Sequence, residues 1–322
     1  MVGAVERRAR PPVPRSVSEP AQRFLGAPSS YSGEIGPPSD PTDLEGWQRF
    51  VDATNELLIQ AFRTRLPEDA PLERREVEVG GVHTYVLRPH GVPDGAPLYL
   101  DIHGGGLVLG AGEACLTMVA PSALSRPMIT WAVDYRMPPR HPYPASLDDC
   151  LAVYRAALES RDPRDIVVGG GSAGGNLAAA LLLRAKDEGL PMPAALVLLT
   201  PEVDLTESGD SFRTNLGIDH VLSPLMTTNL LYANGHDLAH PYLSPLFGDV
   251  HGFPPTYLQS GTRDLFLSNT VRMHRKLRAA GVEAELHIGE AMPHGGFGGG
   301  TPEEAELAAE LERFLARHVR TP

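Results

Sequence analysis

The chain has 322 residues, of which 42% are hydrophobic and 21% charged, the ordinary composition of a globular protein with a large apolar core. Its formal net charge is -12 at pH 7 and it has no long basic run, which argues against nucleic acid as a partner. The two cysteines, Cys115 and Cys150, are too few for a disulfide framework, and we expect them to be buried free thiols.

The N-terminal stretch predicts neither a secretory signal nor a membrane anchor. Arg7, Arg8 and Arg10 are followed by prolines instead of an apolar run, and no stretch is long and apolar enough to span a bilayer. We therefore expect a cytoplasmic protein without membrane insertion. Residues 1–40 are rich in Pro, Ser, Gly and Arg, which predicts a segment that is mobile, or is ordered only by docking onto the body.

Residues 42–66 place apolar side chains at helical spacing and stop before Pro67. A hairpin follows, in which two alternating stretches flank Gly80-Gly81. Beyond it, short apolar strands alternate with helical patterns. The strands are expected at 98–102, 128–133, 166–168, 195–199, 256–259 and 284–288, and the helices at 144–159, 172–188, 269–280 and 302–318.

This alternation predicts an α/β fold in which helices cover both faces of a mostly parallel sheet, because the apolar strands must be buried on both faces. The stretch 205–245 interrupts the rhythm with prolines and mixed polarity. We interpret it as an insertion that forms a lid with an N-terminal part at 41–70. The catalytic domain then spans 71–322.

The most informative motif is the G-x-S-x-G of residues 170–174, which follows one predicted strand and opens a predicted helix. A serine in so tight a turn has a strained backbone that lifts its hydroxyl above the sheet. The sequence therefore predicts that Ser172 is a nucleophile.

The same residues contain a second pattern. Gly169, Gly171 and Gly174 form G-x-G-x-x-G, the fingerprint of dinucleotide-binding folds. Such folds carry an acidic residue about twenty positions on, at the end of the next strand. Here the nearest acid beyond that strand is Glu202, which is too far away, and four predicted strands precede the motif. An oxidoreductase is thus an alternative with weak support.

A second glycine-rich loop, His103-Gly104-Gly105-Gly106, follows directly after the strand 98–102. Glycines let main-chain N–H groups approach a substrate without a Cβ in the way, and such groups stabilise the alkoxide that develops in acyl transfer. This loop upstream and the serine turn downstream are more specific together than either is alone.

With both loops in view, the chain resembles the hormone-sensitive-lipase-like branch of the α/β-hydrolases. The stretches 134–136 and 141–145 also match that branch, and the resemblance runs from about residue 75 to the C-terminus. It implies an eight-stranded, mostly parallel sheet with a helical lid above the site. It also implies that the N–H groups of Gly105, Gly106 and Ala173 form the oxyanion hole.

The chain departs from the family pattern at three places. Gly171 stands where an acidic or hydroxyl residue is usual, and Arg140 stands where glutamate is usual. After the expected catalytic acid the chain reads Leu265-Phe266 instead of Pro-Leu. These departures lie in residues that support the site. They bear on which subgroup of substrates the protein hydrolyses, and not on the type of reaction.

The catalytic acid and base follow from chain order, which runs Ser, Asp or Glu, His in this fold. Asp264 comes just after a predicted strand, at the sheet edge where active sites form. The acids at 204, 210, 219, 237 and 249 belong to the lid region or its return. His294 lies in a glycine-rich loop between the last strand and the last helix. We therefore expect a triad of Ser172, Asp264 and His294.

The resulting prediction is a serine carboxylesterase that hydrolyses short- to medium-chain acyl esters through an acyl-enzyme. A lactone hydrolase or an N-acetyl amide deacetylase with the same triad is the first alternative, and a non-catalytic small-molecule receptor is another. We expect no cofactor and no metal, since no metal-ligand spacing is present. A small-molecule ester is the expected partner, and a homodimer is left open.

Overall fold

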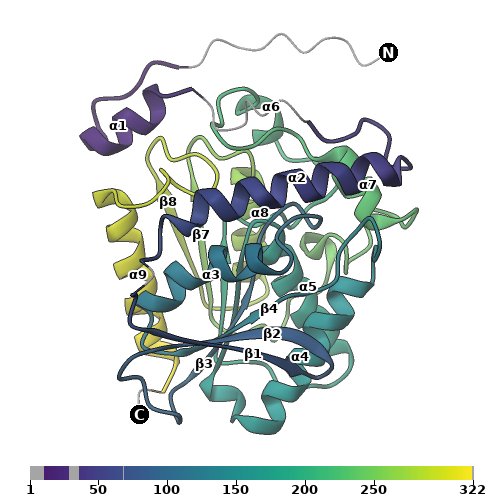
Figure 1. Cartoon of the computed structure of the whole chain (residues 1–322), viewed down its shortest axis with the longest axis vertical. Helices are drawn as coiled ribbons and strands as arrows, with labels where there is room; N and C mark the ends of the chain where they lie inside the picture. The colour runs from purple at the N-terminus through teal and green to yellow at the C-terminus, as the bar shows by residue number, and fades with distance from the viewer. Residues whose placement is uncertain (1–10, 29–35, 68, 321–322) are drawn as a thin grey trace.

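The computed structural model describes residues 11–28, 36–67 and 69–320 (Figure 1). The strands are β1 (Leu72–Val79), β2 (Val82–Pro89), β3 (Leu98–Ile102), β4 (Ile129–Val133), β5 (Ile166–Gly171), β6 (Ala195–Leu199), β7 (Thr256–Gly261) and β8 (Ala284–Gly289). The α-helices are α1 (Glu19–Gly26), α2 (Leu44–Arg63), α3 (Glu113–Ser125), α4 (Ala145–Ser160), α5 (Ala173–Asp187), α6 (Ser211–Thr214), α7 (Met226–Ala233), α8 (Leu267–Ala279) and α9 (Pro302–His318). Short 3-10 turns lie at Pro163–Asp165 and Pro245–Phe247.

All the strands join one eight-stranded sheet in the order β1-β2-β4-β3-β5-β6-β7-β8. The first two strands form the predicted hairpin, and β2 pairs antiparallel with β4. From β4 to β8 every pair is parallel. The prediction of a mostly parallel, eight-stranded α/β-hydrolase sheet is confirmed.

Helices cover both faces of this sheet, because successive side chains of a strand point to opposite faces. Leu98, Leu100 and Ile102 of β3 belong to the large core that includes α4, α5 and α8. Tyr99, between them, belongs to the core on the other face, with Phe314 of α9. The parallel strands are thus buried on both sides, as their apolar sequences predict.

Helix α3 is an element that the sequence patterns did not predict. It contains Pro121, and it buries small residues against the sheet, among them Cys115, Ala120 and Ala123. A proline within a helix and the lack of a clear apolar stripe both weaken the sequence signal for a helix. Cys115 and Cys150 are free and buried, as expected.

Helices α1, α2, α6 and α7 gather at one end of the molecule (Figure 1). Trp47 and Phe50 of α2 are buried against Val108 and Leu109, which follow the glycine loop after β3, and against Leu231 of α7. The segment 205–245 contains α6 and α7, so the two stretches assigned to the lid are in contact. Among the described residues, no helix is both long and apolar enough to cross a membrane.

Within residues 1–40, the described helix α1 packs on the body of the protein. Helix α1 docks onto the body through a small apolar cluster in which Val17, Ala21 and Leu25 meet Met292 and Phe297. Residues 1–10 and 29–35 lie outside the described residues. Of the two alternatives considered for this segment, docking onto the body applies to residues 11–28, because their few apolar side chains have a partner on a distant loop.

Candidate active site

The structure contains the predicted strand–turn–helix motif around Ser172. Ser172 lies between β5 and α5 with φ 57° and ψ -123°, a conformation that costs an L-residue about 1–3 kcal/mol. Its N–H donates to the Leu199 carbonyl at 2.9 Å. Its own carbonyl accepts N–H groups from Gly175 at 3.0 Å and Glu202 at 3.1 Å. These main-chain bonds hold the strained turn, and Ser172 itself stays partly exposed.

Two glycines of this turn have no room for a side chain. A Cβ on Gly174 would lie 1.8 Å from the Ile102 carbonyl oxygen, and a Cβ on Gly170 would lie 2.4 Å from the main chain of Gly174. At Gly171, by contrast, a Cβ would meet nothing closer than 3.7 Å. Steric crowding therefore requires glycine at 170 and 174 but not at 171, where the chain departs from the family pattern.

The glycine loop after β3 lies against the nucleophile turn. A Cβ on Gly104 would be 3.3 Å from the Ser172 Cβ, so a side chain there would crowd the serine. Gly105 and Gly106 have φ values of 120° and 60°, which favour glycine. Within the described part of the chain, the N–H groups of Gly105, Gly106 and Ala173 donate to no acceptor. Unpaired N–H groups beside a nucleophile are the donors that an oxyanion requires.

Asp264 and His294 form a hydrogen-bonded pair. His294 Nδ1 lies 3.0 Å from Asp264 Oδ1. Asp264 is fully buried between β7 and α8, where its other oxygen accepts the Ser260 hydroxyl at 2.6 Å and Oδ1 also accepts the Phe266 N–H at 2.9 Å. Since a carboxylate only accepts, the proton of the neutral ring is on Nδ1. His294 Nε2 then has a free lone pair with which to take up a proton.

The pKa of His294 determines the expected pH dependence. Burial of the ring lowers this pKa, but the charge and hydrogen bond of Asp264 and the charge of Asp219 outweigh burial and raise it above 6.5. Because the base acts when it is neutral, we expect kcat/KM to rise with pH through a midpoint above 6.5. A pH profile with a short-chain chromogenic ester measures that midpoint. A rate that falls steadily from roughly pH 5 to 8 would contradict this role of His294.

Ser172 and His294 are not hydrogen-bonded to each other in the described part of the chain. Bonds of this kind are often long in enzymes without substrate and tighten in the complex. Of the three residues predicted for the triad, the structure thus pairs Asp264 with His294 and sets Ser172 beside the glycine loop.

A buried acid, Glu202, lies beneath the nucleophile turn, and its N–H is one of the donors to the Ser172 carbonyl. Burial raises the pKa of Glu202 to about 8, and the charges of Glu207 and Asp204 act in the same direction. The carboxyl group is therefore protonated at neutral pH.

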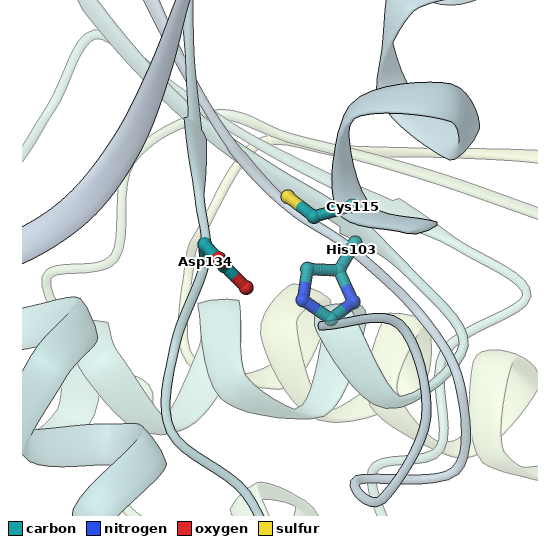
Figure 2. Close-up of side chains that lie close together, drawn as sticks. All are labelled: His103, Cys115 and Asp134. Carbon is teal, nitrogen blue, oxygen red and sulfur yellow. The ribbon is translucent and has the colours of Figure 1, made fainter. Parts of the chain in front are cut away.

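Three side chains with metal-binding chemistry lie close together, as Figure 2 shows. His103, Cys115 and Asp134 offer ligand atoms that lie within 4.8 Å of one another. Asp134 already accepts the Gly112 N–H and a ring nitrogen of His83, each at 2.9 Å. Burial raises the pKa of Cys115 well above its ordinary value.

The contacts of His103 involve the glycine loop that follows β3. The His103 ring stacks on Tyr135 with a centroid separation of 4.2 Å, and its Nδ1 donates to the Gly104 carbonyl at 2.7 Å. The Tyr135 hydroxyl donates to the His103 carbonyl at 2.8 Å. These contacts fix the start of the loop that carries Gly105 and Gly106.

The comparison with known proteins agrees with this architecture. The model of a family described as the alpha/beta hydrolase fold matches residues 99–297. An esterase of Acinetobacter venetianus is 31% identical over 77% of this chain and 83% of its own length.

Two solved structures superpose over nearly the whole chain. The crystal structure of an esterase has a TM-score of 0.84 at 33% identity, and the match covers 97% of this chain and 98% of that one. An esterase from the bacterial hormone-sensitive lipase family has a TM-score of 0.78 at 29% identity over 94% and 99% of the two chains. The chain therefore belongs to the α/β-hydrolase family, and its similarity to the hormone-sensitive-lipase branch is confirmed.

Proposed function

We propose that the protein is a serine carboxylesterase in which Ser172 is the nucleophile, His294 the general base and Asp264 the acid that orients it. The observation that carries this proposal is the set of unpaired N–H groups of Gly105, Gly106 and Ala173 beside Ser172. Three such donors at a strained serine turn have no structural partner among the described residues, and they match the needs of a tetrahedral oxyanion.

The mechanism follows from these groups. His294 Nε2 takes the proton of the Ser172 hydroxyl as the oxygen attacks the acyl carbon, and the carbonyl oxygen of the ester becomes an oxyanion. Asp264 holds the ring in the required tautomer and stabilises its positive charge. The imidazolium then protonates the departing alcohol. Water, deprotonated by the same base, hydrolyses the acyl-enzyme and restores the serine.

Short- to medium-chain acyl esters fit the surroundings of the site. A Cβ on Gly106 would lie 3.7 Å from side-chain atoms of Leu225 and Thr228, so the lid lies close over this part of the oxyanion loop. We infer that Leu225 and Thr228 limit the length of the groups that can be bound. A lactone or an N-acetyl amide would use the same catalytic groups, so these substrates stay as alternatives. The dinucleotide alternative loses its support, since the glycine-rich turn belongs to an α/β-hydrolase.

A panel of chromogenic esters with acyl chains of increasing length, together with a lactone and an N-acetyl amide, tests this proposal. We expect kcat/KM to be highest for short acyl chains and to fall as the chain lengthens. Preferential hydrolysis of the lactone or the amide would assign the reaction to the alternative class. The absence of hydrolysis across the panel, with no labelling by a fluorophosphonate, would overturn the proposal and favour the receptor.

The cytoplasmic location and the homodimer stay predictions. Two buried free thiols are compatible with a reducing compartment. Cell fractionation tests the location, and light scattering coupled to size-exclusion chromatography tests the dimer.

A further inference from the structure

A second buried carboxylate, Asp219, lies between the loops that carry the candidate acid and base. Asp219 is 4% exposed and belongs to the lid segment between α6 and α7. Its Oδ2 accepts the N–H of Leu265, the residue after the candidate acid, at 2.8 Å. Its Oδ1 accepts the His294 N–H at 3.4 Å, and the N–H groups of Val221 and Leu222 at 2.8 and 3.2 Å. One side chain thus contacts three segments that are far apart in sequence.

The lid segment is fastened to the acid loop at two further points. The Asn215 amide donates to the Asp264 carbonyl at 2.8 Å, and the Ser211 hydroxyl donates to the Leu265 carbonyl at 2.7 Å. These bonds involve the acid loop alone. The Asp219 carboxylate is therefore the group, among the contacts described here, that links the lid to the acid loop and the base loop together.

Electrostatics distinguish Asp219 from a purely structural acceptor. The titratable groups that act on it are His294 and Asp264, and those that act on the His294 ring are Asp264 and Asp219. The pKa of Asp219 is raised above its ordinary value, because burial and the charge of Asp264 outweigh His294 and the donated N–H groups, which lower it. Four N–H donors favour the ionised carboxylate. Its negative charge raises the pKa of His294, in the same direction as that of Asp264.

We propose that Asp219 is a positioning residue of the hydrolase reaction, which holds the loop of the candidate acid and the loop of the candidate base in register. This inference rests on the proposed function, because it assigns Asp219 a role in the proton transfer from Ser172. Asp219 contacts the main chain of His294 and not its ring. It therefore acts through the orientation of the ring and through its field, while Asp264 bonds to the ring itself.

Asp219→Asn tests the proposal, because it removes the charge while keeping the size. The amide has one acceptor oxygen, so at least one of the four N–H groups loses its acceptor. We expect kcat per active site to fall about 10- to 100-fold, since a small misplacement of a catalytic group has this effect. We also expect the midpoint of the kcat/KM profile to move to lower pH by about half a unit or more, because the imidazolium loses a negative neighbour.

Two further variants make the test specific. Asp219→Glu keeps the negative charge. The midpoint of its kcat/KM profile should therefore lie closer to the wild-type midpoint than that of Asp219→Asn. Asp204→Asn is the matched control, because Asp204 is a second buried aspartate on the lid side. Its carboxylate bonds to Thr206, Ser208 and Arg272. Its charge is not among those that act on the His294 ring. This control should leave the midpoint where it is. If Asp219→Asn does not fold, Asp219→Ser takes its place under the same criterion.

Active-site titration with a fluorophosphonate separates the possible outcomes, since kcat is then counted per reactive serine. An unchanged midpoint in Asp219→Asn, with kcat within about twofold of the wild type, would overturn the positioning role. An equal shift in Asp204→Asn would overturn it as well, because the effect would not be specific. A failure of the proposed function looks different: the wild-type protein would then be neither labelled at Ser172 nor active on esters.

Discussion

Replacing Ser172 by alanine is expected to remove nearly all ester hydrolysis, with kcat falling about 10⁶-fold. Without the hydroxyl no acyl-enzyme can form, and only the oxyanion donors and substrate binding are left. Alanine keeps the Cβ, so the positive φ of this turn is no more strained than with serine. The variant should therefore fold, and the loss should come from the chemistry. Burst and steady-state kinetics on a short-chain ester measure it.

A control variant and a chemical probe make this experiment decisive. Ser160→Ala removes an exposed hydroxyl at the end of α4 and should leave kcat unchanged. A fluorophosphonate should label Ser172 in the wild type, and the label can be located by mass spectrometry of the digested protein. Labelling at another serine, or hydrolysis at the wild-type rate in Ser172→Ala, would show that the nucleophile has been misassigned.

Asp264→Asn is expected to lower kcat about 10⁴-fold while leaving the fold intact. Asp264 Oδ1 accepts the Nδ1 proton of His294, and an amide presented to the ring can favour the wrong tautomer. The lost charge also lowers the pKa of His294, since Asp264 provides the main contributions that raise it. The expected result is a low kcat together with an acid limb displaced to lower pH.

Ser260 provides the comparison for this variant. Its hydroxyl donates to the other Asp264 oxygen at 2.6 Å, so Ser260→Ala removes a bond to the acid but keeps its charge. We expect this change to be much milder than Asp264→Asn. The combination of Asp264→Asn with Ser172→Ala should be no worse than Ser172→Ala alone, because triad residues act as a unit. Activity of Asp264→Asn within tenfold of the wild type would assign the acid elsewhere.

The parts of the structure that could be predicted are those whose signal is local. Strands 98–102 and 195–199 have the predicted bounds, because each is a short, mainly apolar stretch that ends at a polar residue, His103 or Thr200. The turn at Ser172 could be predicted because strand, glycines and helix lie within a few residues of one another. Asp264 and His294 were chosen by chain order and by their place after a strand, and their hydrogen bond agrees with that choice.

The parts that were missed depend on contacts across long stretches of chain. Asp219 was one of five acids assigned to the lid region or its return, and nothing next to it in sequence indicates that it reaches Leu265 and His294. Helix α1 was not predicted, although Val17, Ala21 and Leu25 form an apolar face. The sequence does not show that this face packs on the loop after β8. Arg140, a departure from the family pattern, contacts Gln48 of α2 at 3.2 Å, a contact that sequence spacing could not reveal.

The docking of α1 has a consequence for the order in which the protein becomes active. Ser18 donates its N–H and hydroxyl to the Glu303 carboxylate, at 2.6 and 2.8 Å, across a sequence separation of 285. Contacts of such high sequence separation form late, since a long loop must be closed before they stabilise anything. During synthesis, the apolar side of α1 leaves the ribosome long before Met292 and Phe297, which cover it. A nascent chain that already contains Ser172 thus still lacks the candidate acid Asp264, the candidate base His294 and the surface on which α1 packs. Hydrolytic activity is expected only after His294 has been made, since no shorter chain carries all three residues of the proposed triad.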